Sequence, residues 1–400
     1  MSCKEKPSVS LAQRQDFQHK QPNSFCQIYF AKAFACPKPT ISLVLKPTAI
    51  RRRNVDNKLN SFIDKALSRR SFLAGAGSVA AAGLVLGASE TKVAAASYGD
   101  TDILNFALNL EYLEAQFYLY AATGKGLAAS ETTAPSGYTG SYTAGTVIPG
   151  NAAAVPGLTT AQQQILNEIA YEEGQHVNFL RTALGSAAVP MPTIDLSFFG
   201  PLAVAAGIYT SSQPAFNPFA SFDAFLIGAF IFEDVGVTAY AGAAPLISAA
   251  GVAAGYLNAA AGIMAVEAYH AAYVRTSLTG RAIAAGATTP TSSVYPYCGI
   301  ANQVAALRAT LTVGNSGAPS TGTGNTGAAG SSTSVEVNLA VPTTLTTPST
   351  IVAADSTRAL GFARTVNQVL HIVYGSPTVG VASGGFFKTG MNSIFATTTA

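Results

Sequence analysis

Two Glu-x-x-His pairs, Glu173 with His176 and Glu267 with His270, have the residue types and spacing to bind a metal. Each pair lies in an apolar, Ala-rich segment that we expect to be helical. Because residues three apart share one face of a helix, each pair can direct a carboxylate and an imidazole at the same point. Carboxylate and imidazole ligands suit iron and manganese better than soft-metal ions.

Each pair is preceded by another expected helix with an embedded glutamate, Glu111 before the first and Glu233 before the second. Four helices that contribute Glu, Glu-x-x-His, Glu and Glu-x-x-His provide the ligand set of a dinuclear iron or manganese centre. Only 11% of the residues are charged and the chain has four histidines. Since a buried ionised carboxylate is costly unless it is paired or binds a metal, glutamates in four apolar helices favour a metal site over solvated surface positions.

The first of these helices offers a choice between Glu111 and Glu114, which lie on one face. Glu111 is followed seven residues later by Tyr118, and Glu233 is followed seven residues later by Tyr240. Seven residues are about two helical turns, so each tyrosine lies on the face of its glutamate. The repeat favours Glu111 as the ligand and leaves Glu114 as an alternate ligand, a partner of the ligands or a surface residue.

The second helix offers a similar choice between Glu172 and Glu173. Only Glu173 has the three-residue spacing to its histidine that the later pair repeats. Glu172 is then a flanking residue or a partner of the ligands, and Asp234, beside Glu233, is equally open. His371 has no acid at ligand spacing, which favours an ordinary core or surface histidine.

Apolar periodicity predicts a four-helix bundle in residues 97–280. Between the second and third helices lies a segment with Pro190 and Pro192 that cannot be one helix. Residues 281–350 are rich in Ala, Gly, Ser, Thr and Pro, with a low-complexity stretch at 314–334. Residues 351–400 should hold a last helix and a tail. The expected helices are 102–123, 161–184, 221–240, 245–278 with a break near Gly251 and a stop at Gly280, 303–311 and 357–373.

Residues 68–96 have the pattern of an export signal. Ser68–Leu73 is a twin-arginine motif, the apolar run after it is too short to span a bilayer, and Val93–Ala96 offers a cleavage site. We expect the twin-arginine machinery to export the chain to the periplasm or extracellular space, or to the thylakoid lumen in a photosynthetic host; a short membrane anchor is the alternative. Residues 1–67 reflect a start codon assigned too far upstream or an organelle transit peptide.

Removing this leader reverses the charge of the chain. Residues 1–96 contain 15 of the 23 Lys and Arg residues but only 5 of the 20 Asp and Glu residues, so residues 97–400 carry a net charge of −7. Eight scattered cations make no basic patch, and a nucleic-acid partner is not expected. With Cys298 alone after the leader, no disulfide can form within this part of the chain.

These residues resemble the ferritin-like superfamily and, within it, the exported ferritin-like domain group that includes plant desiccation-related proteins. The resemblance covers nearly all of residues 100–390. It implies an all-α, ferritin-like four-helix bundle with long irregular loops and an extra C-terminal helix. Those loops make a ferritin cage unexpected and leave another oligomer open. The similar segments are Leu104–Glu114 with Tyr118, Tyr171–His176, Phe232–Tyr240, Glu267–His270, Gln368–Gly375 and Gly384–Phe387.

The resemblance also implies roles for the site residues and two functions. One is an exported oxidoreductase whose iron or manganese pair acts on O2 or hydrogen peroxide as an oxidase, peroxidase or catalase. The other is a non-enzymatic, stress- or desiccation-related metal-binding envelope protein; a bundle without metal is disfavoured because the ligand set is complete. The implied roles are terminal carboxylates at Glu111 and Glu233, bridging carboxylates at Glu173 and Glu267, one imidazole per metal from His176 and His270, and hydrogen bonds from Tyr118 and Tyr240.

Overall fold

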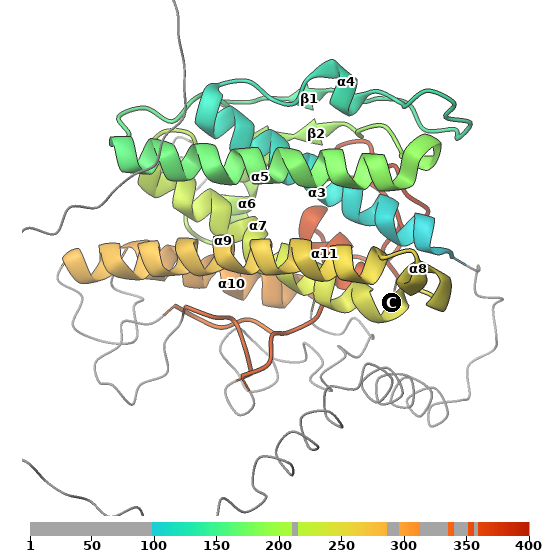
Figure 1. Ribbon diagram of the computed structural model, residues 1–400. Coiled ribbons are helices and arrows are strands. Elements are labelled where there is room, and N and C mark those ends of the chain that lie inside the picture. Colours follow the sequence, from blue (N-terminus) through green and yellow to red (C-terminus); the bar gives the residue numbers. More distant parts are fainter. Residues whose placement is uncertain are drawn as a thin grey trace, which may run out of the picture. The chain divides into compact units, whose positions relative to one another are not determined.

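Four long helices carry the glutamates and histidines of the predicted site (Figure 1). The computed structural model describes residues 98–209, 215–285, 296–312, 335–339, 351–355 and 359–399. Helix α3 packs along α5 and helix α7 along α9, while contacts between α3 and α7 join the two pairs. The all-α bundle expected from the sequence is confirmed. The four helices are α3 (Asp100–Thr123), α5 (Thr160–Leu184), α7 (Phe222–Ala243) and α9 (Tyr256–Ala284).

Side chains next to the helices account for where three of them begin. Thr159 and Ser221 accept backbone N–H bonds from the first turns of α5 and α7, which satisfies donors that have no partner within the helix. Helix α3 starts at Asp100, two residues earlier than predicted. Asp102 lies in its first turn, where its carboxylate accepts a bond from the backbone N–H of Gly99 just before the helix.

The fourth predicted helix is divided differently from the expectation. The segment around Pro245 forms a 3-10 turn (η3, Ala244–Leu246), which is followed by helix α8 (Ala249–Ala253). The break falls at Gly255, whose φ of 89° is left-handed, a conformation that glycine adopts at little cost. Helix α9 then continues past Gly280 to Ala284, because a glycine within a helix weakens it without ending it.

The two long connections contain short elements that pair with each other. Strand β1 (Val147–Ile148), before α5, forms a parallel pair with strand β2 (Ile194–Asp195), after α5. The backbone N–H of Asp195 donates to the carbonyl of Phe386, which ties this pair to the C-terminal region. The other elements here are α4 (Ala129–Thr132), η1 (Gly185–Ala187), η2 (Leu196–Phe198) and α6 (Phe199–Ala205).

The C-terminal region packs on the bundle through two helices. Helix α10 (Pro296–Thr312) contacts α7, α9 and α11 and is longer than the predicted 303–311 helix. Helix α11 (Val366–Val373) is shorter than predicted, because the preceding segment bonds to α7 instead of coiling. There the N–H of Arg364 donates to the carbonyl of Thr238, and Gly242 leaves room for the Arg364 carbonyl.

Aromatic rings fill the core beside the site. Phe117 of α3 packs against the rings of Phe199, Phe219, Phe225 and Phe232. Within the described residues, one segment that includes α7 is long and apolar enough to cross a membrane, but 83% of it is buried inside the bundle. Its apolar sequence therefore reflects a core position.

Three sequence-based predictions lie outside the described residues. These are the extension 1–67, the twin-arginine signal 68–96 and the low-complexity stretch 314–334.

Candidate metal centre

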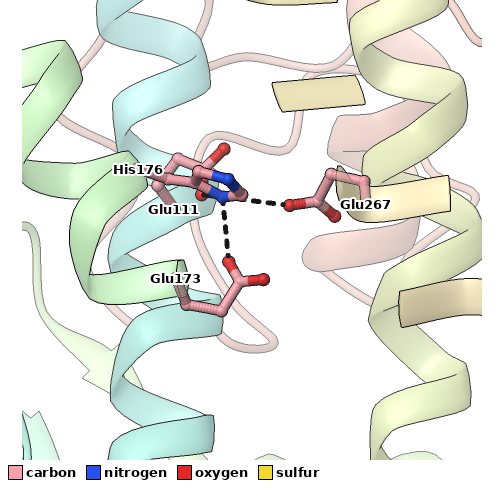
Figure 2. Close-up of side chains that lie close together, drawn as sticks. All are labelled: Glu111, Glu173, His176 and Glu267. Atoms are coloured by element: carbon pink, nitrogen blue, oxygen red, sulfur yellow. Dashed lines mark ion pairs between the residues drawn. The ribbon is translucent and has the colours of Figure 1, made fainter. Parts of the chain in front are cut away.

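The six predicted ligands converge in one buried region between the four long helices. They form two overlapping groups that share Glu173, and within each group one potential ligand atom per residue lies within 4.8 Å of the others. Figure 2 shows the first group, in which ion pairs converge on the His176 imidazole. The groups are Glu111, Glu173, His176 and Glu267, and Glu173, Glu233 and His270.

Glu173 lies between the two candidate histidines. Its Oε2 lies 3.5 Å from Nδ1 of His176, and its Oε1 lies 2.9 Å from Nδ1 of His270. Glu111 Oε2 and Glu267 Oε1 lie 3.2 and 3.4 Å from the His176 nitrogen. Glu233 Oε2 lies 3.7 Å from the His270 nitrogen. This geometry fits the bridging role that the sequence resemblance implies for Glu173, whereas Glu267 lies in the His176 group only. The roles of all six residues stay predictions.

Most of the facing atoms in this cluster lack a well-aligned hydrogen bond, although they lie at ion-pair distances. Buried polar atoms in proteins are almost always hydrogen-bonded, so a concentration of unpaired ones needs a physical reason. A carboxylate- and imidazole-bound cation supplies one, and the oxygen and nitrogen donors suit iron or manganese. The unpaired atoms are Oε2 of Glu111 and Glu233, both carboxylate oxygens of Glu173 and Glu267, and Nδ1 of His176 and His270.

The ionisable groups of the cluster have pKa values shifted from their usual range. Burial opposes ionisation of Glu173, but the two imidazoles facing it outweigh burial and lower its pKa to about 2. Burial and the neighbouring Glu173 raise the pKa of Glu267 to about 8. Burial alone would lower the pKa of His270, but Glu233 and Glu173 raise it to about 10. Burial also raises the pKa of Glu111. The cluster thus retains protons that a bound cation would displace.

The two repeated tyrosines hydrogen-bond across the bundle. Tyr118 of α3 donates to Oε1 of Glu233 on α7, and Tyr240 of α7 donates to Oε1 of Glu111 on α3. If α3 with α5 and α7 with α9 are taken as the two halves of the bundle, each tyrosine hydrogen-bonds to the glutamate of the other half. The bonds leave Oε2 of each glutamate facing the histidines.

Glu172 is placed as a partner of a predicted ligand. Its Oε2 lies 2.7 Å from Nε2 of His270, the ring nitrogen that faces away from Glu173. The side chain keeps 34% of its surface exposed. A carboxylate on the outer nitrogen of a metal-binding histidine fixes the orientation and tautomer of the ring.

Glu114 is buried beside the cluster and has no place in either ligand group. Burial and the nearby Glu267 raise its pKa well above the usual value. With Gly236 and apolar side chains it lines a small cavity with room for a water molecule. A Cβ at Gly236 would lie 2.5 Å from Oε2 of Glu267 and 3.2 Å from Oε1 of Glu114. Glycine at this position therefore makes room for both carboxylates.

Asp234 belongs to a separate buried network of charged residues. Its Oδ2 lies 2.7 Å from Nη1 of Arg275 and 3.1 Å from Nη2 of Arg308. Arg308 in turn lies 2.7 Å from Oε2 of Glu336, and Arg364 pairs with the other oxygen of Glu336. All five residues are buried. The network joins α7 to the C-terminal region, so Asp234 is an anchor of the fold beside the candidate ligand Glu233.

The sequence analysis did not identify the arginines that bond beside the site, although a repeat in the sequence marks two of them. Arg181 and Arg275 each follow a predicted histidine ligand by five residues. Arg181 Nη1 donates to the hydroxyl of Tyr112, just as Arg275 donates to Asp234. Tyr112 and Asp234 each directly follow a candidate terminal glutamate. The repeat could therefore have identified this interaction.

His371 is buried outside the candidate site. Its Nδ1 lies 2.6 Å from the carbonyl oxygen of Ser376, just after the end of α11. It is a core histidine with a backbone partner, as the sequence favoured.

Comparison with known proteins agrees with the fold. Residues 99–280 match the family model of the ferritin-like domain. The desiccation-related protein PCC13-62 of Craterostigma plantagineum is 31% identical over 199 residues, which cover 50% of this chain and 56% of that protein. The ferritin-like catalase Nec2 of Nesocodon mauritianus is 31% identical over 146 residues, which cover 36% and 44%. No solved structure gives a significant match.

Residues 99–280 belong to the ferritin-like domain family, and the chain is related to the desiccation-related proteins. It matches about half the length of each of these two relatives. The buried carboxylate and histidine cluster is compatible with metal binding.

Proposed function

We propose that this protein is an exported dinuclear iron or manganese protein that disproportionates hydrogen peroxide. The observation that carries the proposal is the set of unpaired carboxylate oxygens and imidazole nitrogens around Glu173. Six side chains would hold the two metals, with Glu173 between them. The similarity to a protein named as a ferritin-like catalase supports peroxide as the substrate.

The bundle provides conditions suited to this chemistry. A bound iron or manganese pair would supply two-electron redox chemistry, by which two electrons and two protons pass from one peroxide, leaving O2, to a second peroxide, giving two waters. Tyr118 and Tyr240 hold Glu233 and Glu111 in place and keep hydroxyl protons beside the ligands. The small cavity beside Glu114 suits a molecule of about the size of water or peroxide.

Metal analysis and peroxide assays test this proposal. Protein loaded with iron(II) or manganese(II) should retain about two metal ions per chain, as the six-ligand set implies, and should release O2 from hydrogen peroxide. The Glu173→Ala variant, which removes the shared carboxylate, should lose both properties. Wild-type protein that retains no metal after loading with either ion would overturn the proposal.

A second candidate function follows from the similarity to a desiccation-related protein. In this alternative, the metals stabilise the bundle and no substrate is turned over. A metal-loaded protein that unfolds at higher temperature than the metal-free form, but releases no O2 and consumes neither O2 nor peroxide, would favour this function.

Export is part of the same proposal and is tested separately. The support is the motif that contains Arg69 and Arg70, followed by an apolar run and small residues. Changing both arginines to lysine preserves the charge and should retain the protein on the inner side of the membrane. If cell fractionation still finds the double variant outside, recognition does not depend on the arginines, and export of a folded, metal-loaded protein loses its support.

A further inference from the structure

The two halves of the bundle repeat their functional residues at constant spacing. In α3 and α7 a tyrosine follows the glutamate by seven residues, and in α5 and α9 an arginine follows the histidine by five. The reciprocal bonds of Tyr118 to Glu233 and Tyr240 to Glu111 show that the halves are related in space by an approximate two-fold axis. The equivalent pairs are Glu111 and Glu233, Tyr118 and Tyr240, Glu173 and Glu267, His176 and His270, and Arg181 and Arg275.

One position beside the histidines breaks this repeat. The residue before the glutamate of each Glu-x-x-His pair is Glu172 in α5 but Val266 in α9. Glu172 hydrogen-bonds to Nε2 of His270 across the bundle. By the two-fold relation, Val266 stands where the corresponding partner of His176 would be. A valine side chain can neither donate nor accept a hydrogen bond, and no residue that the structure describes bonds to Nε2 of His176.

The presence of a carboxylate partner on one histidine only should make the two imidazoles unequal as metal ligands. A hydrogen bond from Nε2 to a carboxylate holds the ring in place, reserves Nδ1 for the metal and makes that nitrogen more basic. His270 has this support, and its Nδ1 already points at Glu173. His176 has its Nδ1 among three carboxylates, but no carboxylate of the described residues holds its ring and tautomer through the other nitrogen.

We propose that the two metal positions are inequivalent and that Glu172 and Val266 set the difference. Glu172 is a positioning residue that strengthens the metal position at His270. The position at His176 lacks the equivalent support, and its metal is the one that dissociates or exchanges more readily. The inference rests on the proposed dinuclear centre and adds a distinction between its two ions.

Stepwise metal titration tests the inference without measuring activity. Metal-free protein is titrated with cobalt(II), whose visible absorption reports its ligands, under anaerobic conditions. The wild type should bind in two steps. Glu172→Val should weaken one step by about 10- to 100-fold, the usual effect of losing such a partner, and leave the other step unchanged. Glu172→Gln retains an oxygen acceptor and should recover much of the loss.

Two further variants test whether Glu172 acts by positioning the imidazole of His270 or only through its negative charge. Glu168 lies on α5 one turn before Glu172, is exposed and belongs to neither ligand group, so Glu168→Gln should leave both steps unchanged. Val266→Glu supplies the missing carboxylate at a half-buried position and should strengthen the step that Glu172→Val does not affect.

The outcomes distinguish this inference from the proposed function. If the wild type binds no metal, the dinuclear centre itself is wrong. If two ions bind but Glu172→Val shifts both steps equally, or neither, the centre stands and the inequivalence is overturned. If Glu168→Gln weakens a step as much as Glu172→Val does, the effect belongs to surface charge, and this result would also overturn the inequivalence.

Discussion

The phenol of Tyr118 on α3 donates a hydrogen bond to Oε1 of Glu233 on α7, so the two halves of the bundle meet at a candidate metal ligand. The other oxygen of Glu233 has no hydrogen-bond partner and faces His270. The tyrosine thus fixes the rotation of the carboxylate while leaving one oxygen for a cation. The sequence placed each tyrosine on the face of its own glutamate, but helix packing pairs it with the opposite one.

The Tyr118→Phe variant should be less stable than the wild type in metal-free form. It leaves Oε1 of Glu233 buried without its donor, which costs about 1–3 kcal/mol. Urea unfolding of the metal-free proteins measures the difference. Tyr171→Phe on α5 is the matched control, because Tyr171 is 65% exposed and should tolerate the change. Equal midpoints for Tyr118→Phe and the wild type would contradict a stabilising bond.

The sequence predicted the bundle and the site together because both depend on helical periodicity. Spacings of three and seven residues place side chains on one helix face, so Glu173 with His176 and Glu111 with Tyr118 could be assigned without coordinates. Repetition in the second half then separated Glu111 from Glu114 and Glu173 from Glu172. The structure gathers the six favoured residues, while Glu172 bonds to a histidine and Glu114 lines a cavity.

Contacts between distant segments could not be predicted in this way. Arg308 and Arg364 lie in two separate predicted helices and Glu336 lies between them, and no local period shows that these residues meet Asp234. Likewise, the start of α11 depends on a backbone bond from Arg364 to Thr238, not on the helical propensity of the residues before it. Tertiary contacts of this kind override local preference.

Metal binding should weaken as the pH falls. The pKa values of Glu267 and His270, raised to about 8 and about 10, mean that both groups keep a proton in the metal-free protein at neutral pH. A cation needs the carboxylate and the neutral imidazole, so each proton must leave on binding. Affinity should therefore rise between about pH 6 and about pH 8, with protons released into a weakly buffered solution. An affinity that is flat or increases toward acid pH would contradict these protonation states.

The buried network around Asp234 should be essential to the stability of the bundle. Arg308→Met leaves Asp234 and Glu336 with fewer cations in a buried region, and removing one partner of such a pair costs about 3–5 kcal/mol. Arg281, which pairs with Asp223 near the surface, is the control, and Arg281→Met should cost about 0–1 kcal/mol. Urea midpoints compare the two variants. Similar small losses in both would mean that the C-terminal region is not anchored through Arg308.

Gly236 should be required for metal binding because of its size. A methyl group there would lie 2.5 Å from Oε2 of Glu267, too close to remain without displacing that carboxylate. Gly236→Ala should therefore lower metal affinity by about tenfold or more, as expected when a ligand is disturbed. Gly262 on α9 has open space around its Cβ position, so Gly262→Ala should leave metal binding unchanged and stabilise the helix by about 1 kcal/mol. Metal titration and urea unfolding of both variants test the pair. Unchanged metal affinity in Gly236→Ala would show that Glu267 can move aside freely, and that the close packing of this carboxylate against α7 does not hold it in place as a ligand.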